Sequence, residues 1–91
     1  MMIRMRYNFR GMVQGVGFRY TACRGAEMLG LTGWVRNEYN GSVTVEIQGR
    51  EDAIKSFLKY LENGRFISIE EISSKQLGLD PDERSFDVAG Y

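Results

Sequence analysis

Apolar and polar residues alternate along the first dozen positions of the chain. Ile3, Met5, Tyr7 and Phe9 fall on one face of an extended segment, and arginines occupy most of the opposite face. A period of two residues is typical of a strand that buries one face and leaves the other in contact with water. The pattern therefore predicts a strand over residues 3–13.

Helical spacing replaces this alternation in two later segments. Between residues 18 and 29 the apolar residues recur every three or four positions, and Gly30 is a typical helix terminator. The second segment covers residues 51–63, with acidic residues in its first turn and Gly64 at its end. We expect two amphipathic helices. Their apolar stripes are Phe18, Ala22, Ala26 and Leu29 in the first and Ile54, Phe57, Leu58 and Leu61 in the second.

The remaining segments have strand patterns. Residues 32–37 and 42–48 form a predicted hairpin, joined by Asn40-Gly41, a dipeptide that favours tight turns. A further strand is expected between residues 67 and 77, where a slip in the apolar period indicates a bulge or a shifted boundary. After a turn around Pro81, residues 86–88 form a short last strand.

The order of the first six elements, βαββαβ, favours one fold class. Both helical connections must pack on the same face of an antiparallel sheet, which leaves the other face polar. This arrangement is the ferredoxin-like two-layer α+β sandwich. With 91 residues, the chain is expected to form a single domain, residues 1–91.

A glycine-rich stretch, residues 11–19, joins the first strand to the first helix. It reads Gly-Met-Val-Gln-Gly-Val-Gly-Phe-Arg, and no Ser, Thr, Asp or Asn caps the helix that follows. The unpaired amides and positive dipole of a helix start attract an anion, and Arg19 could bind the same anion with two hydrogen bonds. The alternative is that the glycines only close the connection.

Two nucleotide-binding patterns are excluded in this stretch. Val16 stands where the Walker motif needs its second glycine, and no Lys-Ser or Lys-Thr follows. Tyr20 stands where the dinucleotide fingerprint needs its third glycine. An anion bound here would therefore be smaller than a nucleotide.

Charge and composition narrow the function further. Residues 1–37 hold six arginines and one glutamate, a balance of +5, whereas the rest holds six basic and eleven acidic residues, a balance of −5. The basic half contains the glycine-rich stretch, which favours an anionic ligand, although a solvated sheet face would give the same pattern. Histidine is absent, which excludes His-activated nucleophiles and the usual zinc sites.

Other features of the sequence bear on a catalytic thiol, on a membrane span and on RNA binding. The single cysteine, Cys23, is expected to be a small core residue rather than a catalytic thiol, and it leaves no internal disulfide. No apolar run is long enough to span a membrane. RNA-binding modules of the same topology need exposed aromatic residues on the central strands, and the outward positions here are polar.

Asn37 ends the second strand and supplies a neutral amide. In a right-handed βαβ unit, the end of the second strand comes back close to the loop that leaves the first. We therefore expect Asn37 to lie near Arg19, although asparagine at this position is also typical of a residue that precedes a turn.

Two segments together resemble a known family. Residues 11–19 are similar to the first acylphosphatase signature, and residues 30–37, followed by Gly41-Ser42-Val43, are similar to the second. The resemblance is strongest over residues 11–49. It implies the same fold and the hydrolysis of acyl phosphates to a carboxylate and inorganic phosphate. A non-catalytic module that binds phosphate is the alternative.

The resemblance also implies roles for individual residues. By motif position, Arg19 binds the phosphate, Asn37 positions the attacking water and Ser42 supports the site. No cofactor or metal ligand is implied. We expect a small-molecule acyl phosphate as the partner, no nucleic acid or membrane, and a cytoplasmic monomer. The phosphate cradle is expected to consist of the backbone amides of Gln14, Gly15, Val16, Gly17 and Phe18.

The sequence departs from the family pattern at two places. Glu38 directly follows Asn37, and its charge would repel an anion unless it faces solvent. The tail, residues 86–91, lacks the usual hydrophobic and basic ending. If the tail packs against the glycine-rich loop, we expect an altered stability or substrate preference.

Overall fold

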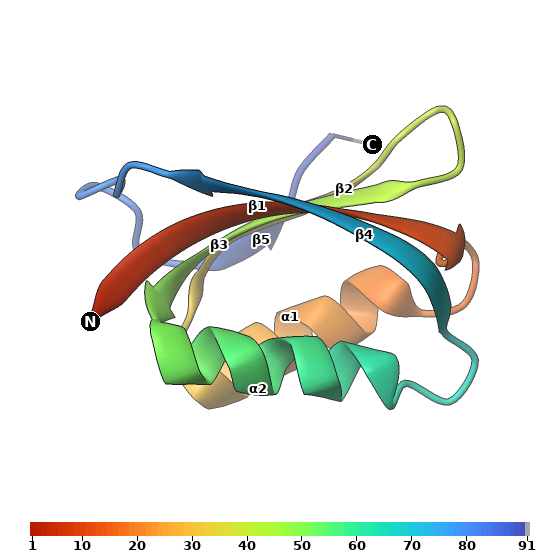
Figure 1. The fold of residues 1–91 in the computed structure, drawn as a ribbon, viewed down its shortest axis with the longest axis horizontal. Helices are drawn as coiled ribbons and strands as arrows, with labels where there is room; N and C mark the ends of the chain where they lie inside the picture. Colours follow the sequence, from red (N-terminus) through yellow and green to blue (C-terminus); the bar gives the residue numbers. More distant parts are fainter. Residues whose placement is uncertain (91) are drawn as a thin grey trace.

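The computed structural model describes residues 1–90, in which two helices cover one face of a five-stranded sheet (Figure 1). Neither helix is long and apolar enough to cross a membrane within this described range. The predicted ferredoxin-like α+β sandwich is confirmed. Its elements are β1 (Met2–Met12), α1 (Phe18–Leu29), β2 (Thr32–Asn37), β3 (Val43–Arg50), α2 (Glu51–Glu62), β4 (Ser68–Leu77) and β5 (Phe86–Val88).

The strands lie in the order β4-β1-β3-β2-β5. The first three neighbouring pairs are antiparallel, as predicted, but β5 pairs in parallel with β2. The sheet is therefore mixed at one edge. The reason is the direction of β4, which runs antiparallel to β2. A chain that turns back after β4 and reaches the β2 edge must run parallel to β2.

The predicted irregularity in the fourth strand is a β-bulge. Arg10 pairs with Glu71 whereas Gly11 pairs with Ile69, so Glu70 has no partner opposite it. Glycine at position 11 allows β1 and β4 to approach this closely at the bulge, because a Cβ atom there would lie 2.4 Å from the carbonyl oxygen of Ser68. The first glycine of the glycine-rich stretch thus serves the packing of β1 on β4 rather than a ligand.

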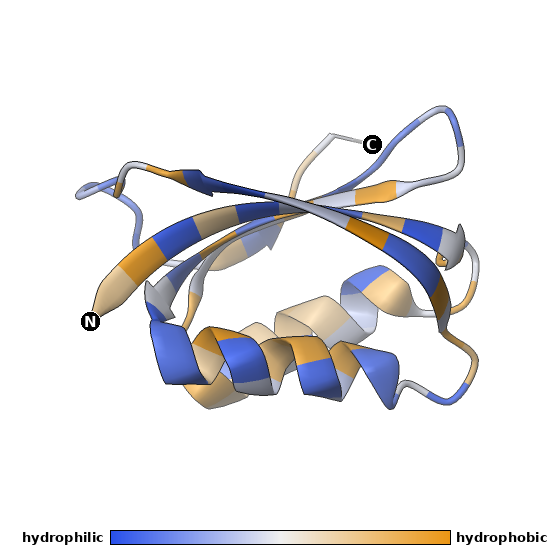
Figure 2. Ribbon diagram, in the orientation of Figure 1, coloured by the Kyte–Doolittle hydropathy of each residue, from blue (hydrophilic) through white to orange (hydrophobic). Residues whose placement is uncertain are grey.

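The core lies between the inner face of the sheet and the apolar sides of both helices (Figure 2). Phe9 of β1 packs against Phe18 of α1 with ring centroids 5.1 Å apart. Phe18 follows the glycine-rich loop directly, so this contact fixes the start of α1 over the sheet. The largest fully buried side chains are Phe9, Phe18, Phe57, Ile47, Ile54, Leu61, Val13, Val35, Val43 and Val45.

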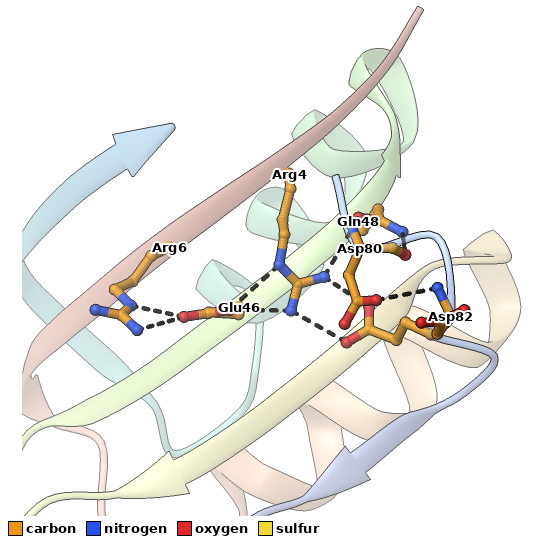
Figure 3. Close-up of polar contacts among 7 residues, drawn as sticks. Arg4, Arg6, Glu46, Gln48, Asp80 and Asp82 are labelled. Carbon is orange, nitrogen blue, oxygen red and sulfur yellow. Dashed lines mark hydrogen bonds and ion pairs between the residues drawn. The ribbon is translucent and has the colours of Figure 1, made fainter. Parts of the chain in front are cut away.

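The outer face of the sheet is polar, as predicted, but one end of it is buried. Arg4 of β1 is only 5% exposed, and its guanidinium points toward the carboxylate of Glu46 (Figure 3). The guanidinium lies 2.9 Å from the carboxylate of Glu46 and 2.8 Å from that of Glu83. Gln48 exchanges two hydrogen bonds with the backbone of Asp80. Residues 78–85 therefore cover this end of the outer face. Glu83 and Glu46 raise the pKa of Arg4 by hydrogen bonding to its charged form, so this cluster holds its guanidinium ionised.

Candidate active site

A cavity of about 220 Å³ lies at the N-terminus of α1. It brings together Arg19, from the first turn of α1, and Asn37, from the end of β2. The structure therefore places these two residues at one cavity. The lining residues are Val13, Gly15, Gly17, Phe18, Arg19, Tyr20 and Asn37.

The start of α1 has neither a side-chain cap nor an acidic residue in its first turn. Gly17 is the N-cap residue and has a left-handed backbone (φ 80°, ψ 17°), which glycine adopts without strain. The positive end of the helix dipole is therefore not compensated by a neighbouring carboxylate, and it points toward the cavity.

Only part of the predicted cradle lines the cavity. Gly15, Gly17 and Phe18 do so, whereas Val16 packs against the hydrophobic core. Gln14 is directed elsewhere. Its carboxamide Nε2 donates hydrogen bonds to the carbonyl oxygens of Glu38 and Ser42, at 2.7 and 2.9 Å. The sequence predicts a role for the backbone amide of Gln14, and it misses this side-chain link.

The Gln14 link joins the two halves of the site. Gly15, Gly17 and Phe18 line the cavity with Arg19, and residues 38–42 form the turn that follows Asn37. One side chain thus holds the glycine-rich loop against the β2–β3 turn. The signal in the sequence is the single amide side chain within residues 11–18, which are otherwise apolar or glycine.

We expect Gln14→Ala to lower kcat/KM for benzoyl phosphate by up to about 10²-fold, since a misplacement of ~1 Å can have an effect of this size. The fold should be retained, because Gln14 contributes nothing to the hydrophobic core. Steady-state kinetics and circular dichroism measure the two effects. Gln76→Ala, on the exposed side of β4, is the matched control. An unchanged kcat/KM in Gln14→Ala would contradict the proposed link.

Ser42 contacts the turn rather than the cavity. Its hydroxyl donates to Asn40 Oδ1 at 2.6 Å and accepts from Asn8 Nδ2 at 3.0 Å. Its carbonyl oxygen also accepts from the backbone amide of Glu38. Ser42 is thus in a position to order the turn between β2 and β3, and any support for the site would be indirect.

Glu38 points away from the cavity. Its carboxylate accepts hydrogen bonds from Thr44 Oγ1 at 2.6 Å and from the Arg36 guanidinium at 3.0 Å. These contacts lower the pKa of Glu38, with the Thr44 hydroxyl the larger cause and Arg36 next. The positive charge of Arg36 offsets the negative charge of Glu38. The repulsion between Glu38 and a bound anion, which the sequence suggests, is therefore reduced.

The tail runs beside β2 and not beside the glycine-rich loop. Ala89 donates its backbone N–H to the carbonyl oxygen of Val35 at 2.8 Å, and Gly90 packs against the side-chain stem of Arg36. Tyr91 lies outside the described residues. Residues 86–90 therefore do not make the contact with the glycine-rich loop that would alter stability or substrate preference.

Two further features limit the chemistry. Cys23 is half-buried against the core, and burial raises the pKa of its thiol, so the thiol remains protonated at neutral pH. In the described part of the chain, no three Asp, Glu or Cys side chains gather as they would around a metal ion. The cavity offers an arginine, an amide and backbone N–H groups instead.

The chain is thus a ferredoxin-like sandwich with a cavity, lined by Arg19 and Asn37, at the uncapped start of its first helix. Comparison with known proteins gives its family. The acylphosphatase family model matches residues 5–88. The chain is 38% identical over 86 residues to an acylphosphatase of Oceanobacillus iheyensis, covering 92% of this chain and 94% of that protein. It is 40% identical over 88 residues to one from Geobacillus thermodenitrificans, covering 96% and 94%.

A solved structure agrees with this result. The crystal structure of acylphosphatase from Bacillus subtilis matches with a TM-score of 0.89 at 33% identity, covering 99% of this chain and all of that one. The chain belongs to the acylphosphatase family. This membership confirms the family predicted from the two motifs, and with it the predicted activity, hydrolysis of acyl phosphates.

Proposed function

We propose that the cavity at the start of α1 is the site where this acylphosphatase cleaves the carboxyl–phosphate bond. Arg19 and the amides of residues 14–18 bind the phosphoryl group, and Asn37 places the attacking water. The observation that carries this proposal is that Arg19 and Asn37 line one cavity. The two residues come from different elements, and each matches a position in the family motifs.

The reaction suits these side chains. An acyl phosphate is a mixed anhydride, so it is already activated, and water needs orientation more than deprotonation. The Asn37 carboxamide can both donate to and accept from that water. The water oxygen attacks phosphorus, the bond to the carboxylate oxygen breaks, and a proton of the water passes to a phosphoryl oxygen. The products are a carboxylate and inorganic phosphate, and no histidine is needed.

The negative charge of the phosphoryl group is stabilised by hydrogen-bond donors that are fixed in the protein. Arg19 supplies a guanidinium, the loop supplies backbone N–H groups, and α1 presents its positive dipole end. Donors that are already oriented toward developing charge stabilise the transition state without reorganisation. In this scheme the protein performs the role that a magnesium ion performs in many phosphoryl-transfer sites.

We therefore expect hydrolysis of benzoyl phosphate to be unchanged by EDTA. The measurement is the initial rate after dialysis against chelator, with and without added Mg²⁺. A rate that falls on chelation and returns with Mg²⁺ would show that a metal takes part. The assay also separates the enzyme from a non-catalytic module, because such a module would bind inorganic phosphate without turnover.

The remaining parts of the proposal concern the state of the protein. We infer a single domain over residues 1–91 that acts as a cytoplasmic monomer on a small-molecule acyl phosphate. The outward positions of β1 and β3 carry no aromatic residue that could stack on bases, which argues against an RNA-binding role. At one end of that face, the segment 78–85 already covers the charged side chains.

A further inference from the structure

We propose that Glu38 is a positioning residue for Asn37, which it holds in place from the face of the sheet opposite to the cavity. Arg36 and Thr44 are its partners. The inference rests on the proposed role of Asn37 and extends it to a residue that never touches substrate. Glu38 is one of the positions at which this chain departs from the family pattern.

The geometry places Asn37 between two linked side chains. Residues alternate across β2, so Arg36 and Glu38 lie on the outer face while Asn37 lies on the side of the cavity. The Arg36 guanidinium donates to Glu38 Oε2 at 3.0 Å. This ion pair therefore spans Asn37 from its preceding to its following residue, and it restricts the backbone on both sides.

Thr44 ties this pair to the neighbouring strand. It lies opposite Arg36 in the β2–β3 register, and its hydroxyl donates to the same Oε2 atom of Glu38 at 2.6 Å. Asn8 of β1 in turn donates to Thr44 Oγ1 at 3.2 Å. The Glu38 carboxylate is thus connected through side chains to both central strands of the sheet.

Arg36 is itself held in place. Its guanidinium carbon lies 4.9 Å from the centroid of the Trp34 ring, and the backbone of Gly90 packs against its stem. The main chain of Glu38 is fixed as well, because its carbonyl oxygen accepts from Gln14. Side chain and backbone of Glu38 are therefore anchored independently.

The position of Asn37 explains why such anchoring matters. Asn37 pairs with Val43 in the last rung of the β2–β3 ladder, and the parallel pairing with β5 ends two residues earlier, at Val35. The end of a strand opens more easily than its centre. A side chain that must orient one water molecule needs more order than the ladder alone provides there.

The charge of Glu38 is protected under neutral conditions. The groups that face it are Arg36 of β2, Thr44 of β3 and, farther away, Arg6 of β1, and together they lower its pKa. A group whose pKa is lowered by folding keeps its contribution above its ordinary range and loses it as pH falls through the lowered value. The ion pair with Arg36 should therefore fail only in acid.

The test compares Glu38→Gln and Glu38→Ala with wild-type protein. We expect kcat for benzoyl phosphate to fall by about tenfold to 10²-fold, with KM and the inhibition constant of inorganic phosphate unchanged. As pH is lowered, wild-type kcat should converge on that of Glu38→Gln. Glu71→Gln, an exposed carboxylate near Arg10, is the matched control and should behave as wild type. Circular dichroism verifies that each variant is folded.

A double-mutant cycle with Asn37→Ala decides whether Glu38 acts through Asn37. We expect Glu38→Ala to add little to the loss in Asn37→Ala, because the group that it positions is gone. Additive losses, or an unchanged kcat in both Glu38 variants, would overturn the inference. So would a lower KM and tighter phosphate inhibition in Glu38→Gln, which would show that the carboxylate only repels the substrate. Full turnover in Asn37→Ala alone would instead overturn the proposed function.

Discussion

Arg19→Ala is expected to lower kcat/KM for benzoyl phosphate by about 10²–10³-fold, equivalent to roughly 3–4 kcal/mol of transition-state stabilisation. Arg19 lines the cavity at the start of α1, and alanine at this position carries no cation. Both phosphate affinity and turnover should fall, because charge is present in the bound state and grows in the transition state. Initial rates and inhibition by inorganic phosphate measure the two losses.

A second substitution separates charge from geometry at this position. Arg19→Lys keeps the positive charge but cannot form two parallel hydrogen bonds, so it should recover binding better than turnover. Arg50→Ala, at the end of β3 beside the start of β1, is the matched control for a lost arginine. Near-normal hydrolysis by Arg19→Ala would mean that another group binds the phosphoryl oxygens.

Asn37→Ala, in contrast, is expected to lower turnover while leaving phosphate binding almost unchanged. It should reduce kcat by about 10²-fold or more, since correct placement of a reactant can supply that much rate. Inhibition by inorganic phosphate should be almost unchanged, because Arg19 and the loop remain. Single-turnover rates and phosphate inhibition, measured on the same preparation, give both numbers.

The control for this change is Asn63→Ala, an exposed asparagine at the end of α2. It should leave both quantities as in wild-type protein. If Asn37→Ala instead weakened phosphate binding and kept its turnover, Asn37 would bind substrate and another group would orient the water.

The main elements could be predicted because their patterns are strong and local. The alternation in β1 and the helical stripes of α1 and α2 follow directly from the sequence. The bulge at Glu70 could also be predicted, since an extra residue shifts the apolar period. By contrast, the parallel pairing of β5 depends on where the irregular segment 78–85 leads, and no period in the sequence records that path.

Burial of the outer face could not be predicted for a related reason. Arg4 and Glu46 occupy positions that alternate with core residues, and charged residues at such positions usually contact water. Their burial depends on Glu83, which lies far away in the sequence within a segment that has no regular structure. Only the folded chain shows that the three residues meet.

The candidate site was predictable to a different extent. Arg19 and Asn37 share a cavity because the topology of β1, α1 and β2 brings two strand ends together, and topology follows from the pattern. The side-chain bonds of Gln14 and Glu38 were not predictable. Each depends on one carbonyl, hydroxyl or guanidinium that comes within reach only after β2 and β3 have paired.

The cluster of Arg4, Glu46 and Glu83 affects where the domain can loosen. If the segment 78–85 detached, Arg4 would lose its hydrogen bonds to Glu83 and Gln48 would lose its two bonds to the backbone of Asp80, while the pair of Arg4 with Glu46 would remain. We expect local opening to be less frequent at this end of the sheet, where β1 begins, than at the opposite end, beside the glycine-rich loop of the proposed site.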